Sequence, residues 1–138
     1  MRKVVHVAPH TTSNINSKSI SKSGGAAIYR GVLNIGKKAE HAKATVSCES
    51  LMLDEISQSD TIPSISIEND NVDLGHEAKI GRISDEAIFY LMTRGISEEE
   101  ARAMLVRGFV EPISKELPLE YAVEMNNLIS LELEGSIG

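Results

Sequence analysis

Three residues of this chain, a cysteine, a histidine and a glutamate, have side chains able to bind a metal ion or move a proton. They are Cys48, His76 and Glu77, and each lies in a stretch where apolar residues alternate with polar ones. Successive side chains of a strand point to opposite faces, so Cys48 shares a face with Val46, and His76 shares one with Leu74. Glu77 points to the other face unless its strand bulges. Thiolate, imidazole and carboxylate groups can together bind a metal ion.

The spacing of Cys48 and His76 favours a shared site only in one kind of fold. They lie 28 positions apart (76 − 48), so in a β-solenoid with rungs of about 20–30 residues they occupy neighbouring rungs. Such rungs stack about 4.8 Å apart, which lets two side chains share a metal ion or a proton. The alternative for each residue is a structural role, because a free cysteine is most often a small buried residue and a lone histidine a hydrogen-bonded structural one.

Other chemistry finds less support. The chain has no GxGxxG, GxxxxGK[ST], GxSxG or HExxH motif. A cysteine nucleophile with a neighbouring base is a further alternative, but no oxyanion loop accompanies it. His6 and His10 flank Pro9 and are expected to be an exposed pair, and His41 is expected in a turn.

Composition limits the class of protein. The chain has 138 residues, 41% hydrophobic and 25% charged, which fits one globular domain or two small ones. A single cysteine excludes an internal disulfide and any all-cysteine metal site within one copy. With no tryptophan and a net charge of −6, nucleic-acid binding is disfavoured. There is no apolar run of membrane-spanning length and no signal-peptide core, so we expect a cytoplasmic protein without membrane attachment.

The charge is unevenly distributed, and so are the structural patterns. Residues 1–80 carry nine basic and nine acidic residues, whereas residues 81–138 carry five and eleven. The first segment shows period-two alternation between polar turns, which predicts short strands in a sandwich, a barrel or a β-solenoid. The shortage of large side chains favours the solenoid, whose narrow rungs hold valine, isoleucine, leucine and alanine. We therefore expect two domains, 1–80 and 81–138.

The second segment has the period of helices. Ser84 caps a first helix that Gly95 ends, and Ser97 begins a capping box for a second that is expected to end at Gly108. Pro118 suits the first turn of a third helix, which runs to about residue 134. Three helices in about 50 residues bury little apolar surface, so they are expected to pack on the β segment or on a partner.

Several segments, taken in order, resemble the C-terminal end of the SufB/SufD family. They are 17–25, 29–31, 48–53, 76–78, 89–91, 94–101, 116–122 and 132–138. The resemblance covers nearly the whole chain. It implies an all-β part that forms the last rungs of a right-handed parallel β-helix, followed by a C-terminal unit of three helices.

The resemblance also implies a function. In this family SufB and SufD form a scaffold, not an enzyme, on which an iron–sulfur cluster is assembled transiently, and the SufC ATPase docks on the helical domains. Cys48 matches a SufB cysteine, which makes Cys48, His76 and Glu77 candidate cluster ligands, although Gly75 replaces a glutamate typical of the SufB motif. Mixed ligands hold iron less tightly than four thiolates, which suits release. No tightly bound cluster is expected in the isolated chain.

An alternative from another class remains open. In a SufD-like structural module Cys48 is buried, and the chain only pairs with a paralogue through the β-helix and binds the ATPase. By resemblance the chain is about the last third of a family member: a fragment, a truncated product or a short homologue. Its first rung would then expose strand edges, so self-association near residues 4–7 is expected.

Overall fold

The computed structural model describes residues 2–134, and the chain divides into two compact units, residues 1–82 and 83–138. The first unit contains all the strands and the second all the helices. Each unit is described by itself.

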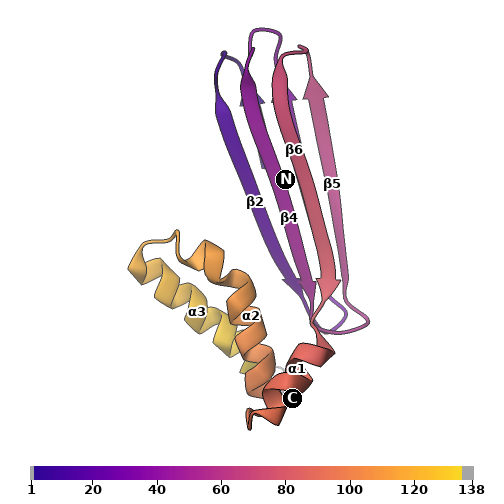
Figure 1. The fold of residues 1–138 in the computed structure, drawn as a ribbon, viewed down its shortest axis with the longest axis vertical. Coiled ribbons are helices and arrows are strands. Elements are labelled where there is room, and N and C mark those ends of the chain that lie inside the picture. The colour runs from indigo at the N-terminus through magenta and orange to yellow at the C-terminus, as the bar shows by residue number, and fades with distance from the viewer. Residues whose placement is uncertain (1, 135–138) are drawn as a thin grey trace. The chain divides into compact units, whose positions relative to one another are not determined.

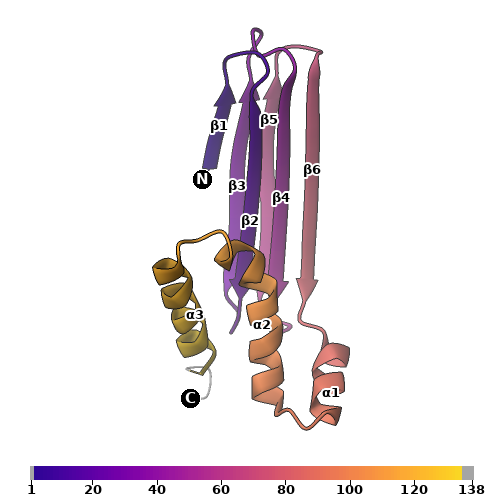
Figure 2. The same ribbon diagram turned by 60° about the vertical axis from the view of Figure 1, so that its left-hand side comes forward.

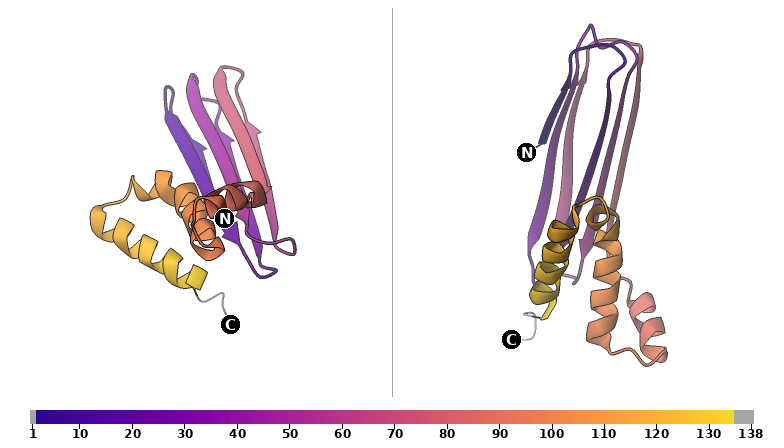
Figure 3. Two further views of the ribbon diagram at one scale, coloured as in Figure 1. Left: turned by 60° about the horizontal axis from the view of Figure 1, so that its bottom comes forward. Right: turned by 90° about the vertical axis from the view of Figure 1, so that its left-hand side faces the viewer.

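The first unit is a short β-helix. Its strands are β1 (Arg2–His6), β2 (Thr12–Ser21), β3 (Ala26–Ile35), β4 (Ala42–Met52), β5 (Gln58–Ile67) and β6 (Val72–Arg82). The odd strands form one parallel sheet, β1-β3-β5, and the even strands another, β2-β4-β6. The two sheets lie face to face as layers (Figure 1; Figure 3, right). The predicted partial β-helix is thereby confirmed, whereas the sandwich and the barrel are not found.

Each rung consists of one strand from each sheet, and the repeat is close to 30 residues. Arg2 pairs with Gly31 and Ala26 with Gln58, offsets of 29 and 32 positions (31 − 2 and 58 − 26). β1 is only five residues long, so the first rung is less complete than the others (Figure 2). This repeat places residues about 30 positions apart side by side, as a shared site between Cys48 and His76 requires.

Small apolar side chains fill the space between the sheets. Every second residue of β4 from Ala42 to Ser50 is buried, and Leu33 and Ile35 of β3 lie opposite them in the same core. Ile35 has no solvent exposure at all. Because the layers are close, alanine, valine and leucine suffice to fill the rung, which explains the low aromatic content.

The corners at one end of the rungs are held by side chains that bridge one rung to the next. The side-chain Nδ2 of Asn69 donates to the carbonyls of Gly36 and Ala39, 2.9 and 3.3 Å away. His10 and His41 occupy equivalent left-handed positions, both with φ of 57°, and their rings stack with centroids 4.8 Å apart. The expectation of a turn at His41 is confirmed.

His6 differs from its sequence-based expectation. It is buried, and its ring nitrogens lie 2.6 Å from the Thr11 hydroxyl and 2.8 Å from the Ser13 hydroxyl. The prediction that it is exposed was wrong, because β1 ends at this residue and its side chain points into the unit beside two hydroxyl partners.

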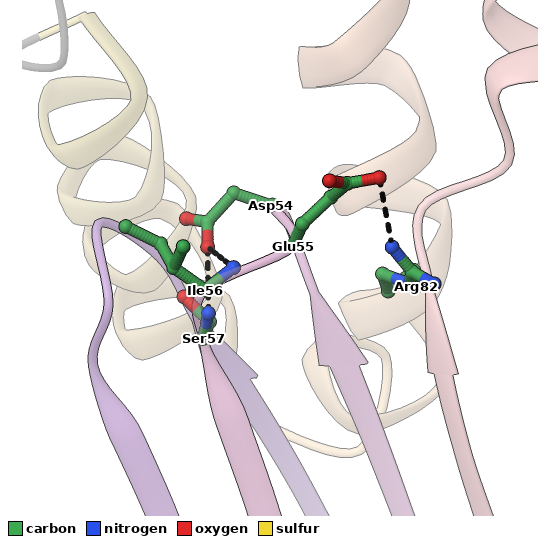
Figure 4. Close-up of polar contacts among 5 residues, drawn as sticks. All are labelled: Asp54, Glu55, Ile56, Ser57 and Arg82. Atoms are coloured by element: carbon green, nitrogen blue, oxygen red, sulfur yellow. Dashed lines mark hydrogen bonds and ion pairs between the residues drawn. The ribbon is translucent and has the colours of Figure 1, made fainter.

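The Asp54 carboxylate organises a corner at the other end of the β-helix (Figure 4). One oxygen accepts hydrogen bonds from the backbone amides of Ile56 and Ser57, at 3.1 and 2.7 Å, and the other accepts one from Ser23 in the preceding corner. The Ser57 side chain, through its own hydrogen bond, makes the largest contribution to lowering the pKa of Asp54, and the three backbone bonds lower it further. Beside it, Glu55 forms an ion pair with Arg82, 3.2 Å away, which ties the corner to the end of β6.

We expect Asp54→Ala to destabilise the first unit in a pH-dependent way. The pKa of this carboxyl is lower in the folded state than in the unfolded chain, so its stabilisation is complete above the unfolded pKa, about 3.9. It disappears as the pH falls through the folded value. Thermal unfolding followed at several pH values should show a melting temperature difference from the wild type at pH 7 that shrinks towards pH 3. Asp73→Ala, which removes an exposed carboxylate from β6, is the control; an equal pH-dependent loss there would contradict the corner role.

The second unit contains α1 (Asp85–Thr93), α2 (Glu98–Ser114) and α3 (Leu119–Glu134). The Ser84 hydroxyl accepts from the Ala87 amide and the Ser97 hydroxyl from the Glu100 amide, so both predicted caps are present. Gly95 ends the α1 segment with φ of 86°, a conformation that glycine adopts without strain. The buried apolar side chains of these helices include Ile88, Ala101, Val106 and Val110.

One helix boundary was predicted wrongly. α2 does not end at Gly108 but continues to Ser114, with Pro112 inside its last turn. Val110 lies beyond the glycine and is buried, so packing of this extra turn outweighs the weak helix propensity of Gly108. Among the helices in the described part of the chain, none has the length and apolar character needed to cross a bilayer.

Candidate functional site

Cys48 lies near the middle of β4 and points into the β-helix. Only 1% of its surface is exposed, and it belongs to the core that contains Val46 and Leu33. The cross-rung partners of Cys48 are Ser17 on one side and Ala78 on the other. In β6, which belongs to the last rung, the residue next to Cys48 is therefore Ala78, whose side chain is only a methyl group.

His76 lies near Cys48 on the neighbouring strand. The two residues are offset by two positions along the strands and lie on the same face. In the ladder between β4 and β6, His76 pairs with Val46, two positions from Cys48. Parallel strands in register point their paired side chains to the same side, so His76 and Cys48 share one face of the sheet. From a strand spacing of about 4.8 Å and a rise of about 3.3 Å per residue, their α-carbons are about 8 Å apart. His76 is exposed, because β6 is the last strand of its sheet.

Glu77 lies on the opposite face from this pair. It pairs in register with Ser47, and its carboxylate forms an exposed ion pair with Lys79, 3.1 Å away. This carboxylate raises the pKa of Lys79. In residues 2–134, no three cysteine, histidine or acidic side chains come together closely enough to hold a metal ion. The fold thus places Cys48 and His76 on a common face and leaves Glu77 apart from them.

The environment of Cys48 favours the neutral thiol. Burial raises the pKa of its thiol above the usual value, since the charged thiolate is poorly solvated between the sheets. Cys48 would become a thiolate upon binding iron, since metal binding displaces the thiol proton.

We expect Cys48 in the folded chain to react slowly with alkylating reagents, because the thiol is both buried and protonated. Iodoacetamide labelling followed by mass spectrometry should be slow in buffer and fast in denaturant, where the thiol has free access to solvent. Equal rates in the two conditions would show that Cys48 is not enclosed by the β-helix.

Sequence reasoning missed Tyr29, which lies opposite Cys48 inside the β-helix. Tyr29 is six residues before the end of β3 at Ile35, and Cys48 is six residues after the start of β4 at Ala42. β3 runs towards the corner between these strands, and β4 runs away from it. The backbones of the two residues are therefore equally far from that corner, on opposite sides of the interior. The Tyr29 side chain packs against the core that contains Cys48.

The Tyr29 hydroxyl has an unusual position. Its ring lies over Gly31, where a β-carbon would come within 2.5 Å of the hydroxyl oxygen. Within the described residues, the hydroxyl oxygen is buried and has no hydrogen-bond partner. Burial, and secondarily the charge of Cys48, raise the pKa of Tyr29, while Arg2 opposes this shift. The available signal was the order Tyr29-Arg30-Gly31. Strand alternation places Tyr29 and Gly31 on the inward face, and glycine has no side chain beside the ring.

Hydroxyl groups line the rest of this end of the interior. Ser19 and Ser50 hydrogen-bond across two rungs, with their oxygens 2.7 Å apart. The buried hydroxyls of Ser21 and Ser59 make no hydrogen bond within the described residues. Buried polar groups are normally paired, so the interior beyond Cys48 is more polar than a core made only for stability.

Comparison with known proteins places these features in a family. Residues 1–109 match the family described as SUF system FeS cluster assembly, SufBD core domain. The chain is 59% identical over 136 residues to the iron–sulfur cluster assembly protein SufB of Bacillus subtilis, and equally identical to an iron–sulfur cluster assembly SufBD family protein of Staphylococcus haemolyticus. A SufBD family protein of Staphylococcus aureus is 58% identical over the same length.

These matches cover 99% of this chain but only 29% of each relative, so the chain spans less than a third of their length. The match to the core-domain family extends through the whole β-helix and into α2. The chain therefore belongs to the SufBD family of the SUF system for iron–sulfur cluster assembly.

Proposed function

We propose that this chain forms the end of a SufB-type scaffold that holds an iron–sulfur cluster while it is assembled. The cluster is cargo that is taken up and released, and the chain acts as a scaffold in the cytoplasm rather than as an enzyme. The β-helix, which we assign to residues 1–80, presents the cluster-side residues. The helical domain, residues 81–138, docks a SufC-like ATPase.

The observation that supports this proposal best is the position of Cys48 and His76 on one face of two adjacent strands. About 8 Å between α-carbons allows a cysteine and a histidine side chain to reach a common iron atom. Ala78 and the exposed His76 are the residues between Cys48 and the end of the stack, so the site opens where the last rung ends. Glu77 becomes a third ligand when a β-bulge in this edge strand turns it to the other face.

Reconstitution tests the ligand roles. The chain is equilibrated anaerobically by dialysis against ferrous iron and sulfide, and it is then assayed for bound iron and for visible charge-transfer absorbance. Cys48→Ser should lose most of both, and His76→Asn should retain less than the wild type. His41→Asn is the matched control, because it removes an exposed histidine from a corner outside the site. Unchanged iron binding in Cys48→Ser would remove Cys48 from the ligand set.

The last rung is proposed as the surface that pairs with a SufD-like or SufB-like paralogue. Within residues 2–134, β5 and β6 each pair with only one strand, and Ile65, Ile67 and Ile80 are exposed there. An apolar open edge is a template for further strands. The same property predicts self-association of the isolated chain, either here or at β1 in the first rung.

Light scattering after gel filtration tests this pairing. Ile67→Lys places a charge on the inward side of the edge strand, since Ile67 pairs with the buried Ile35, and should shift the oligomer towards the monomer. Ile62→Lys, on the other face of β5 opposite Arg30, is the control. If the wild type is already monomeric, or if both variants behave alike, the edge is not the pairing surface.

Exposed apolar side chains on the helices support the docking role. Leu119 and Tyr121 at the start of α3 are 75% and 68% exposed, and Phe89 of α1 is 68% exposed. A double variant, Leu119→Ser with Tyr121→Ser, should weaken capture of a SufC-like ATPase in a pull-down. Substitutions on the acidic faces of the helices should have the same effect. Unchanged capture would place the interface elsewhere.

A second function remains because Cys48 is so well buried. In a SufD-like structural module the cysteine only fills the core, and the chain contributes pairing and docking surfaces. Burial of the thiol and its raised pKa favour this alternative. The reconstitution experiment separates the two, since a structural module binds no more iron as the wild type than as the Cys48→Ser variant.

A further inference from the structure

Two histidines stack on one corner of the β-helix, outside the candidate site. His10 and His41 are 31 positions apart (41 − 10), occupy the same corner of neighbouring rungs, and are both exposed. The backbone fixes this repeat. The His10 amide donates to the Glu40 carbonyl at 2.8 Å, and the His41 amide donates to the Asn71 carbonyl at 2.7 Å. Two imidazoles are thus held side by side on a hydrogen-bonded frame.

The separation of the two rings is the one that a shared metal ion requires. A metal–nitrogen bond is about 2.0–2.1 Å long, which places the centroid of a bound imidazole about 3.2 Å from the ion. Two imidazoles bound at an angle of about 90–109° therefore have centroids about 4.5–5.2 Å apart. The centroids of His10 and His41 are 4.8 Å apart. Their planes, which are 11° from parallel, must turn towards each other, and exposed side chains can rotate in this way without a change in the backbone.

Asn71, at the corner of the next rung, can orient the His41 ring. Its side-chain Nδ2 lies 3.2 Å from Nε2 of His41. When the Asn71 amide turns by 180°, Nε2–H of His41 donates to the amide oxygen, and Nδ1 carries no proton and can bind a metal ion. Metal-binding histidines normally donate their other ring N–H to an acceptor, which fixes the tautomer and the orientation of the ring.

We propose that His10 and His41 form a surface chelate for a late first-row divalent metal ion such as Cu²⁺, Ni²⁺ or Zn²⁺. Imidazole is a preferred ligand of these ions, and such sites bind them more tightly than Fe²⁺. Because Fe²⁺ is low in this order, His41→Asn remains a control for the iron reconstitution. Within residues 2–134 no third cysteine, histidine or acidic side chain joins the pair. Water therefore completes the coordination, and the ion exchanges readily.

Calorimetric titration with Ni²⁺ alone tests this site. The full chain carrying Cys48→Ser and His76→Asn is the starting protein, since it lacks the proposed cluster ligands, and it should bind one Ni²⁺ ion. Adding His10→Asn or His41→Asn should weaken binding about tenfold or more, because either change removes the chelate. Asparagine tolerates the left-handed φ of 57° at both positions, so these variants should fold normally. The control is Asp73→Asn, an exposed change on β6, which should bind Ni²⁺ as the starting protein does.

The ring nitrogens identify the ligand atoms. In nuclear magnetic resonance spectra, Zn²⁺ should shift Nδ1 of His41 and one ring nitrogen of His10, and Nε2 of His41 should keep its proton. Asn71→Ala should weaken Ni²⁺ binding less than either histidine change, since it removes only the orienting group. If the starting protein binds no Ni²⁺, or if the His10 and His41 variants bind it as tightly as the Asp73 control, the proposal is overturned. Neither result affects the role proposed for Cys48, which the starting protein lacks.

Discussion

Ile35→Ala is expected to remove much of the stability of the β-helical unit. Ile35 has no exposed surface, and it packs in the core beside Leu33 and Val46. Truncating such a side chain leaves a cavity and typically costs ~2–5 kcal/mol. A unit of about 80 residues has a total stability of roughly 4–12 kcal/mol, so a large fraction would be lost.

Urea unfolding followed by far-ultraviolet circular dichroism measures this loss. Ile56→Ala is the control, because Ile56 is 71% exposed in a corner, and a surface change should stay within about 0.5 kcal/mol of zero. If Ile35→Ala does not fold, Ile35→Val supplies the measurement, with an expected loss of ~0.5–1.5 kcal/mol. Equal midpoints for the Ile35 and Ile56 variants would show that the two sheets do not share this core.

Gly31→Ala should be the second large effect, although it adds only a methyl group. The new β-carbon would lie 2.5 Å from the Tyr29 hydroxyl, so the ring or the strand must shift. Overpacking of this kind costs ~1–3 kcal/mol. The substitution should also displace the Tyr29 ring from its position over residue 31.

Gly81→Ala in β6 provides a matched comparison, because no atom lies within 4 Å of a β-carbon built there. It should be neutral or slightly stabilising. Combining Gly31→Ala with Tyr29→Ala should cost less than the sum of the two single changes, since the clash disappears with the ring. Additive costs would mean that the ring can avoid residue 31, and the assigned contact would be wrong.

The sequence predicted the fold class because two different periods are visible in it. Alternation around Val46 and Cys48 follows the strand period, and the capping serines Ser84 and Ser97 mark helix starts that the structure confirms. The choice of a solenoid depended on the small side chains, which fit a narrow interior. A family resemblance then supplied the topology that alternation alone leaves open.

Other strands could not be recognised from the sequence, because the residues at their inward positions are polar. β2 places Ser17, Ser19 and Ser21 inside, so its alternation has no apolar signal after Ile15. The segment 58–60 contains turn-forming residues but begins β5, since pairing with β3 fixes the strand there. Sequence propensity describes local preferences, whereas each rung here is positioned by its neighbours.

The candidate site was predicted in part. Strand alternation predicts that Cys48 and His76 lie on the same face. Their offset of two residues along the strands depends on the rung length, which varies with each corner. Glu77 was expected on the other face unless β6 bulges, and the structure places it there. Tyr29 could not be found from spacing, because its relation to Cys48 depends on the corner between β3 and β4.

Iron binding by the wild-type chain and by Cys48→Ser, compared side by side under anaerobic reconstitution, tests the central claim most directly. At equilibrium with free iron and sulfide, the wild type should bind both with visible charge-transfer absorbance, and Cys48→Ser should bind little of either while keeping the same circular dichroism spectrum and melting profile. If the serine variant retains as much iron and sulfide as the wild type, Cys48 does not hold the cluster, and the chain is a structural member of its family.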